Sequence, residues 1–370
     1  MERELQRVRE KEPVIYDPVD GWFERRDEAR KNFASLPRVI KFDSIPWSQN
    51  LQAYHKVFIR TKGGDFLVGD FRGWSAPIYT MTCLEQILSP GGKSGRHRHY
   101  FEALFFILEG KGYEIHDGVK YDWEQGDLVI VPTYTIHQHF NASTTEGARL
   151  FYLIPGAFNF MGISDTEQIE SHEGFKPREG TQVSRLGLDE HGQKLQDLMY
   201  ARRAIDTPLA SEAQTFYDEY LNVTAEENRW RATMARVVKP AERSWEVTRQ
   251  GKLRWFVHPR LNTALRTLES FQQELEAGGR SGMHRHVGEE IMLVLEGRGH
   301  SVIDGVKWEW EKEDLICVPI NSIHQHFNAD PRHLALLLSI TCRLYSFVGH
   351  GGIEQFEDSS IYLQEREKRG

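Results

Sequence analysis

Two clusters of histidine at matched spacing are the residues of this chain best suited to chemistry. His97 and His99 form an HxH pair, and His137 follows about 40 residues later. The second cluster has the same histidine spacing and adds a carboxylate; its members are His284, His286, Glu290 and His324. Imidazoles, with or without a carboxylate, suit a first-row divalent metal ion, so both clusters are predicted metal sites.

The spacing within each HxH pair indicates how the ligands converge. Side chains two residues apart on a β-strand point to the same face, so His97 and His99 meet if they lie on a strand. Glu290 shares this parity with His284 and His286. A single HxH pair is more often an ordinary surface or core feature, but two pairs, each with a distant third histidine, favour metal ligation.

An internal repeat explains why the clusters match. His284 lies 187 residues after His97, and His324 lies 187 residues after His137 (284 − 97 = 324 − 137 = 187). The segment IHQHFNA at 136–142 recurs unchanged at 323–329. Self-similarity of this extent at a constant offset indicates a duplicated domain.

Each copy has the pattern of a β-structure. Short apolar runs such as Ala103–Leu108 and Leu128–Val131 are separated by Gly, Pro, Asn and Asp, which predicts many short strands in a jelly roll or barrel. The segments Gly192–Arg203 and Ala225–Val238 carry helix-period patterns instead. The predicted fold is all-β with a helical connector: an N-terminal arm (1–50), a first barrel (51–161), the connector (162–240), a second barrel (241–356) and a charged tail (357–370).

Composition and charge argue against several classes of protein. The formal net charge of −8 argues against a general nucleic-acid binder, which needs a basic face. The N-terminus has no apolar signal region, and no run of about 18 apolar residues predicts a membrane span. The cysteines are Cys83, Cys317 and Cys342; they predict buried free thiols and a cytoplasmic location.

The repeat resembles the cupin superfamily, whose first motif is HxH, Glu and Gly and whose second motif is Gly, Pro, His and Asn. The second copy matches the first motif with His284, His286, Glu290 and Gly297. The second motif is matched in the first copy by Gly126, Pro132, His137 and Asn141, and in the second copy by Pro319, His324 and Asn328, with Glu313 in place of the glycine. The resemblance covers residues 76–160 and 263–347, about half of the chain, and implies two tandem cupin jelly-roll β-barrels.

The first copy carries Ala103 where the first motif has its glutamate. Glu102, like its counterpart Glu289, has the opposite parity and is expected to point away from the metal. A neutral three-histidine site leaves coordination positions open and preserves the Lewis acidity of a bound ion. HRH followed by alanine at this place is similar to the gentisate 1,2-dioxygenase-type bicupins, which cleave aromatic rings.

This closer resemblance implies roles for individual residues. It implies that Fe(II) binds to His97, His99 and His137 in the N-terminal barrel, with Mn(II), Ni(II) or Zn(II) as alternative ions. It also implies that His139 is a catalytic group that hydrogen-bonds substrate or oxygen. His139 and His137 share parity and could exchange roles, and a buried structural histidine is the alternative for His139.

Two departures from the gentisate type bear on the substrate and on the second site. Phe105 stands where those enzymes carry the arginine that holds the substrate carboxylate, and Arg149 or a residue of the arm is the available replacement. Phe101, Ala103 and Phe105 predict an apolar, aromatic wall against the substrate, with plain barrel core as the alternative. The metal ligands of the C-terminal barrel, which such enzymes usually lose, are retained here.

The leading hypothesis is an Fe(II)-dependent, extradiol-type dioxygenase that cleaves a hydroxylated aromatic ring lacking the carboxylate of gentisate. Its partners would be a small aromatic substrate and O2, with neither nucleic acid nor membrane. The alternatives are an oxalate-decarboxylase-like bicupin using manganese, which Glu290 favours, and a non-catalytic metal- or ligand-binding bicupin. The cupin resemblance implies a homodimer or homotetramer.

Overall fold

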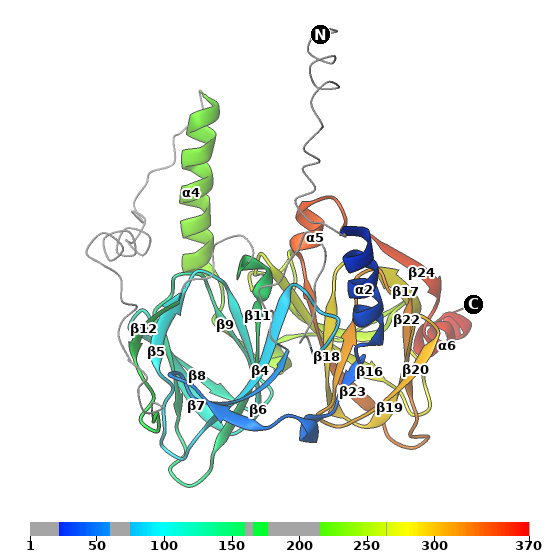
Figure 1. Cartoon of the computed structure of the whole chain (residues 1–370), viewed down its shortest axis with the longest axis horizontal. Coiled ribbons are helices and arrows are strands. Elements are labelled where there is room, and N and C mark those ends of the chain that lie inside the picture. The colour runs from blue at the N-terminus through cyan, green and yellow to red at the C-terminus, as the bar shows by residue number, and fades with distance from the viewer. Residues whose placement is uncertain (1–21, 60–74, 160–165, 177–214, 264, 370) are drawn as a thin grey trace.

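The computed structural model describes residues 22–59, 75–159, 166–176, 215–263 and 265–369. Two β-barrels lie side by side (Figure 1), and each is built from one seven-stranded and one five-stranded sheet. The predicted all-β fold with two tandem barrels is confirmed.

The first barrel combines the sheet β13-β9-β6-β11-β4-β3-β2 with the sheet β12-β5-β10-β7-β8. Its strands are β2 (Trp47–Gln49), β3 (Tyr54–Ile59), β4 (Met81–Leu88), β5 (Arg96–His99), β6 (Ala103–Glu109), β7 (Lys111–His116), β8 (Val119–Glu124), β9 (Leu128–Val131), β10 (His137–Asn141), β11 (Ala148–Pro155), β12 (Thr166–Glu170) and β13 (Val237–Val238).

The second barrel combines the sheet β1-β21-β18-β23-β16-β15-β14 with the sheet β20-β19-β22-β17-β24. Its strands are β1 (Val39–Ile40), β14 (Glu246–Thr248), β15 (Gly251–Val257), β16 (Leu268–Leu275), β17 (Met283–His286), β18 (Glu290–Glu296), β19 (Arg298–Ile303), β20 (Val306–Glu311), β21 (Leu315–Val318), β22 (His324–Asn328), β23 (Ala335–Cys342) and β24 (Ile353–Glu357).

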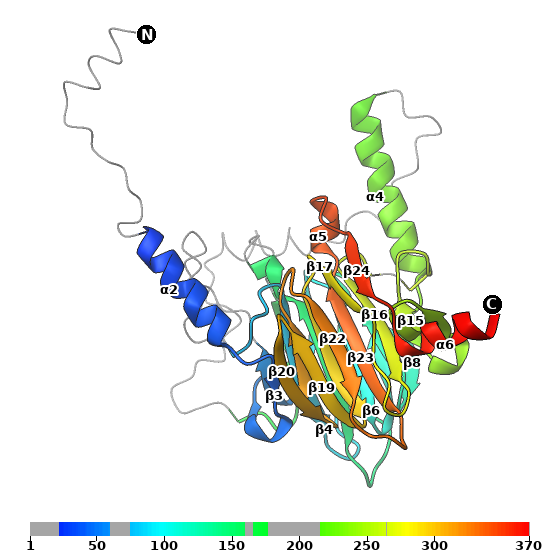
Figure 2. The same ribbon diagram turned by 90° about the vertical axis from the view of Figure 1, so that its right-hand side faces the viewer.

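The helices lie outside the barrels: α2 (Trp22–Ser35), α4 (Phe216–Thr233), α5 (Leu344–Phe347) and α6 (Ser360–Arg369). Helix α4 projects away from the barrels (Figures 1 and 2). It begins at a capping box in which the Thr215 side chain accepts a hydrogen bond from the Asp218 N–H. The helix predicted at 225–238 therefore begins earlier and ends earlier, because its last residues form β13; the helix predicted at 192–203 lies outside the described residues. No described helix is long and apolar enough to cross a membrane.

A short strand from each half of the chain crosses to the opposite barrel. Strand β1 pairs with β21 of the second barrel, and β13 pairs with β9 of the first. Parts of the predicted arm and connector are therefore built into the sheets, and the tail forms α6 against β14 and β15. The sequence RVIK at 38–41 recurs as RVVK at 236–239, so the duplication extends beyond the residues that carry the cupin motifs.

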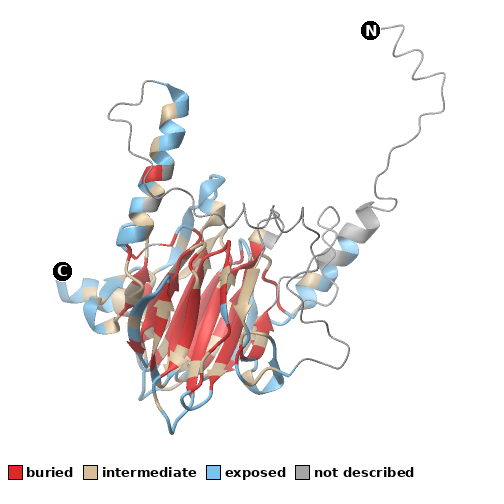
Figure 3. Ribbon diagram, turned by 90° about the vertical axis from the view of Figure 1, so that its left-hand side faces the viewer, coloured by how far each residue is buried: buried red, intermediate tan, exposed pale blue. Residues whose placement is uncertain are grey.

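The two barrels share one apolar core. Buried side chains of both, including Phe58, Phe151, Phe256 and Leu293, belong to a single cluster, and the buried strands fill the centre of the molecule (Figure 3). All three cysteines lie in this cluster and are unpaired: Cys83, Cys317 and Cys342. Burial raises the pKa of each thiol, so none is activated as a nucleophile.

Two buried carboxylates bridge the barrels in equivalent ways. Glu102 accepts hydrogen bonds from two successive backbone N–H groups at 3.0 Å and from the Thr267 hydroxyl at 2.6 Å. Glu289 accepts from two successive N–H groups at 2.6 and 2.8 Å and from the Thr80 hydroxyl at 2.5 Å. Each carboxylate thus reaches into the opposite barrel, away from the histidines of its own barrel.

One turn of the second barrel has a glutamate with a positive φ where the first barrel has a glycine. Gly126 has φ +90° and Glu313, its counterpart, has φ +73°, a region that side-chain-bearing residues rarely adopt. The Glu313 carboxylate accepts a hydrogen bond from Arg149 of the first barrel at 2.9 Å. The position that departs from the cupin motif therefore makes a contact between the barrels.

Candidate metal centres

Three imidazoles meet inside the first barrel. His97 and His99 lie on β5, and His137 begins β10 directly opposite His97. All three are buried, and one nitrogen of each lies within 4.8 Å of the others. The convergence that strand alternation predicts is therefore present; the role of these residues as metal ligands is a proposal.

Backbone carbonyls fix the orientation of these rings. The Nδ1 atoms of His97, His99 and His137 are hydrogen-bonded to carbonyl oxygens at 3.2, 2.6 and 2.9 Å. If each Nδ1 carries the proton, each Nε2 keeps a free lone pair, as in histidines that bind metals. The buried Nε2 of His137 has no hydrogen-bond partner among the described residues, so the cluster fits a divalent ion.

The second barrel repeats this arrangement with a carboxylate added. His284, His286 and His324 form the same kind of cluster. One oxygen of Glu290 lies 3.3 Å from His286 Nε2 and 3.6 Å from His324 Nε2, while its other oxygen accepts a hydrogen bond from Ser339. Burial acts to raise the pKa of Glu290, but its contacts with His286 and His324 hold it well below the usual value.

The first barrel has no carboxylate at this position. Ala103 and Glu290 occupy equivalent places, opposite Val131 of β9 and Val318 of β21 respectively. The neighbouring Glu102 is committed to the opposite barrel. The site around His97 is therefore a three-histidine site.

His139 has a buried carboxylate partner that sequence analysis did not identify. Its Nδ1 lies 2.6 Å from Glu114 Oε1, and both side chains are almost completely buried. Burial raises the pKa of Glu114 to about 7. The counterpart pair in the second barrel is His326 with Ser301, at 2.7 Å. Glu114 stands where the second copy has Ser301, and this difference between the copies is the sequence signal that could have identified the partner.

The predicted substrate wall lies beside the three-histidine cluster. The ring of Phe101 stacks on His99 at 4.1 Å, and the ring of Phe105 lies 4.4 Å from that of His139. Ala103 and Phe105 belong to the apolar cluster inside the barrel. Phe101 and Phe105 thus contact the histidines, while Ala103 and Phe105 pack within the barrel.

Arg149 does not replace the arginine that is absent at position 105. Its guanidinium forms ion pairs with Glu85, Glu109 and Glu313 at 2.6, 2.8 and 2.9 Å. Strand alternation also separates the two sides: Leu150 and Tyr152 belong to the interior cluster, so Arg149 lies on the opposite face of β11. Of the two replacements that the sequence leaves open, Arg149 is therefore committed to these ion pairs.

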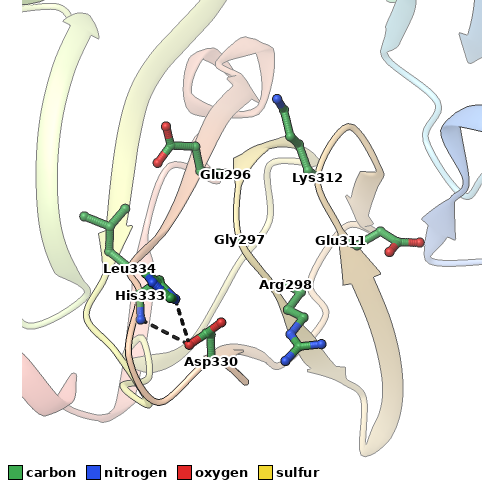
Figure 4. Close-up of a pocket in the computed structure, with 8 residues that line it drawn as sticks. All are labelled: Glu296, Gly297, Arg298, Glu311, Lys312, Asp330, His333 and Leu334. Atoms are coloured by element: carbon green, nitrogen blue, oxygen red, sulfur yellow. Dashed lines mark hydrogen bonds and ion pairs between the residues drawn. The ribbon is translucent and has the colours of Figure 1, made fainter.

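Two hollows lie at opposite ends of the second barrel. One, of about 170 Å³, reaches His284, His286 and Glu290 and includes the aromatic side chains of Trp255 and Phe271. The other, of about 470 Å³, is lined by Glu296, Gly297, Arg298, Glu311, Lys312, Asp330, His333 and Leu334 (Figure 4). Because its residues lie at the far ends of β18 and β22, this second hollow contains none of the clustered histidines.

The buried histidines predict that the metal-free protein is sensitive to acid. Burial lowers the pKa of five of them to between about 2 and 3: His97, His99, His139, His284 and His326. An unfolded histidine titrates near 6.5, so below that pH the unfolded chain binds more protons and stability falls as pH drops towards 3. We expect a loss of about 1.4 kcal/mol per such histidine for each pH unit below 6.5, measured by urea unfolding at pH 7.5 and 5.5.

Two buried carboxyl groups oppose this loss of stability at low pH. Burial raises the pKa of Glu114 and Glu289 to about 7, above the usual value near 4.5, so the stability they contribute is present below pH 4.5 and lost as pH rises to 7. Because the destabilising contribution of the five histidines is larger than the stabilising contribution of these two carboxyl groups, the free energy of unfolding is expected to be lower at pH 5.5 than at pH 7.5. An unfolding free energy that is equal at the two pH values, or higher at pH 5.5, would contradict the expected acid sensitivity.

Comparisons with known proteins agree with this geometry. The cupin domain family matches residues 84–154 and 271–341. Gentisate 1,2 dioxygenase 1 of Aquipseudomonas alcaligenes is 23% identical over 236 residues, which are 63% of this chain and 62% of that protein, less than two thirds of its length. A solved structure of a salicylate 1,2-dioxygenase variant from Pseudoaminobacter salicylatoxidans in complex with gentisate has a TM-score of 0.56 at 17% identity, over 93% of this chain and 97% of that chain. A structure of oxalate decarboxylase has a TM-score of 0.52 at 14% identity, over 83% of this chain and 77% of that chain.

The two domain matches fall on the two copies of the repeat, one in each barrel. Both copies place their histidines on equivalent strands. The chain therefore carries two tandem domains that match the cupin domain family, one in each barrel, and it resembles the gentisate 1,2-dioxygenases.

Proposed function

We propose that the first barrel is the centre of an Fe(II)-dependent dioxygenase that cleaves a hydroxylated aromatic ring without a ring carboxylate. The observation that carries this proposal is the neutral three-histidine cluster with Ala103 at the place of a carboxylate ligand. The relatives named as gentisate and salicylate dioxygenases support the reaction class. Extradiol-type cleavage, a cytoplasmic location and a homodimer or homotetramer are further parts of the proposal.

His97, His99 and His137 would hold the metal ion. A bound Fe(II) would supply open coordination positions and one-electron redox chemistry for a phenol and O2. Mn(II), Ni(II) and Zn(II) are alternative occupants. Because all three ligands are neutral, the charge of the ion is not offset by the protein, which favours binding of an ionised phenol.

The surrounding side chains orient the ring and handle protons. Phe105 stacks on Tyr152 with ring centroids 5.0 Å apart and lies beside His139, which makes an apolar surface for an aromatic substrate. His139 is the proposed acid–base group: its Nε2 takes a proton from a phenol while its Nδ1 proton passes to Glu114, whose pKa burial raises to about 7, and both protons then return.

The test is oxygen consumption by protein loaded anaerobically with Fe(II). We expect O2 uptake with at least one phenol of a panel that includes hydroquinone, catechol, salicylate and gentisate, with matching loss of ring absorbance. Mass spectrometry of the product locates the cleaved bond and so tests the extradiol assignment. Lack of O2 uptake with every phenol, in protein shown to contain iron, would rule out this function.

Substitution of Glu114 by glutamine is expected to slow turnover without removing metal. Glutamine keeps the size of the side chain but loses the charge that holds the proton on His139 Nδ1. We expect kcat to fall about 10- to 100-fold, within the range of a general acid–base contribution, with unchanged iron content. Steady-state kinetics and metal analysis measure both quantities.

The matched control is Ser301→Ala in the second barrel, which removes the counterpart partner of His326. This variant is expected to keep the kcat of the wild type. Equal losses in the two variants would indicate a general effect on folding and would contradict the assigned role of Glu114.

A second candidate function is supported by the second barrel. Its cluster includes Glu290, and the hollow of about 170 Å³ reaches that cluster, an arrangement suited to a manganese centre acting on a small dicarboxylate such as oxalate. CO2 release from oxalate by Mn(II)-loaded protein, without net O2 uptake, would support an oxalate-decarboxylase-like activity. A non-catalytic bicupin would release no CO2 and consume no O2.

A further inference from the structure

The interior of the first barrel contains a buried histidine whose ring nitrogens lack hydrogen bonds of normal geometry. His55 lies on β3 opposite Gln86 of β4 and is 1% exposed. The ring has the Gln86 side chain and the Ala53 backbone as polar neighbours, but neither ring nitrogen, nor the amide nitrogen of Gln86, makes a hydrogen bond of normal geometry within the described part of the chain. A buried polar group without a partner costs about 1–3 kcal/mol, so fold stability does not account for an imidazole here.

His55 belongs to the same internal surface as the proposed site. Val57, two residues along β3, packs against the interior apolar cluster, and strand alternation places His55 on that face. The ring of His55 lies 5.7 Å from that of Tyr152, Tyr152 stacks on Phe105, and Phe105 lies against His139. These rings form one continuous surface that leads to the proposed acid–base group.

The second barrel provides a comparison within the same chain. Gln273 is the counterpart of Gln86 and lies opposite Leu253 of β15, so Leu253 occupies the place of His55. The Gln273 amide donates to a backbone carbonyl at 3.0 Å. The same strand pairing therefore exists in the second barrel with an apolar residue and with a glutamine whose amide nitrogen is bonded, so the imidazole and the unbonded amide nitrogen at this pairing occur in the first barrel.

The charge of His55 indicates what it can bind. Burial lowers the pKa of His55 to about 4, so the imidazole is neutral at pH 7. A neutral imidazole exchanges hydrogen bonds with a hydroxyl group. It does not supply the positive charge that a buried carboxylate requires.

We propose that His55 is a specificity-determining residue of the first barrel, which hydrogen-bonds an uncharged hydroxyl of the substrate where gentisate-type enzymes bind a carboxylate. The substrate class is then a benzene ring with two or more hydroxyl groups and no ring carboxylate. One hydroxyl faces the three-histidine cluster and another meets His55. This inference rests on the proposed ring-cleaving function.

The test compares His55→Leu, which installs the residue of the second barrel, with His55→Gln, which keeps a hydrogen-bonding group. Fe(II)-loaded protein is titrated with hydroquinone by calorimetry without O2, and O2 uptake is then measured. We expect His55→Leu to raise Kd and KM about tenfold or more, the effect of one hydrogen bond, with kcat changed less than about threefold. We expect the thermal midpoint of His55→Leu to equal or exceed that of the wild type, and His55→Gln to recover part of the affinity.

His300→Leu, which removes a histidine from the second barrel, is the control and is expected to leave Kd and KM unchanged. Unchanged Kd and KM in His55→Leu would overturn the role of His55 and leave the ring-cleaving function standing. Binding of hydroquinone that depends on His55, without O2 uptake by the wild type, would overturn the ring-cleaving function and uphold the role of His55. Failure of the iron-loaded wild type to bind any hydroxylated benzene would overturn both.

Discussion

Substitution of His97 by alanine is expected to abolish oxygen uptake by the iron-loaded protein. His97 carries one of three imidazole nitrogens that lie within 4.8 Å of one another and are the proposed ligands, and two imidazoles alone bind a divalent ion weakly. Because a bound metal supplies several kcal/mol of catalytic stabilisation, we expect kcat to fall by about 1,000-fold or more. Metal analysis after anaerobic loading should show the loss of about one ion per chain, and an oxygen electrode measures the activity.

His284→Ala is the matched variant, because it removes the equivalent ligand from the second barrel. It should also lose about one ion per chain while retaining oxygen uptake. The opposite pattern, with activity lost in His284→Ala and kept in His97→Ala, would contradict the assignment of ring cleavage to the first barrel. Loss of activity in both variants with normal thermal midpoints would show that the two centres act together.

The histidine clusters could be predicted because their geometry is local. Alternation along a strand brings His97 and His99 to one face, and this requires only that four residues, Arg96–His99, form a strand. The third histidine of the cluster, His137, was identified by the repeat, since His324 stands at the same distance from its own HxH pair. Ala103 could likewise be recognised as a departure from the carboxylate at Glu290.

The polar partners inside the first barrel could be predicted only with knowledge of the register between strands. Glu114 reaches His139 because β7 pairs with β10 so that the two residues lie opposite each other. His55 faces Gln86 only in the register of β3 with β4. Neither pairing is marked by periodicity within a strand, so sequence analysis did not identify Glu114 or His55.

The strands that cross between the barrels could not be predicted from the sequence, because they are too short. β1 and β13 contain two residues each, too few to show alternation. Their pairing across barrels depends on contacts between residues that are far apart in the chain, such as Val39 with Ile316. The ion pairs of Arg149 could not be predicted either, because its three carboxylate partners come from two strands of the first barrel and a turn of the second.

Alternation along the strands predicted the direction of the Glu102 and Glu289 side chains, but it could not predict their hydrogen-bond partners. Both face away from the histidines, as expected, and each accepts three hydrogen bonds from the opposite barrel. Equivalent glutamates in both copies that point away from the histidine clusters are the sequence feature that could have indicated a structural role. Because both side chains are buried at the junction, they are expected to govern the docking of the barrels.

We expect the double variant Glu102→Gln and Glu289→Gln to unfold at a much lower urea concentration than the wild type. Each glutamine turns an NH2 group towards buried N–H donors, and disrupting a buried charged network costs about 3–5 kcal/mol. The two sites share no hydrogen-bond partner, so the losses in the single variants should add. Unfolding is measured at pH 8, because burial raises the pKa of Glu289 to about 7 and its carboxylate is then ionised. The exposed Glu146→Gln is the control, and a double variant with the wild-type midpoint would show that Glu102 and Glu289 do not govern the docking of the barrels.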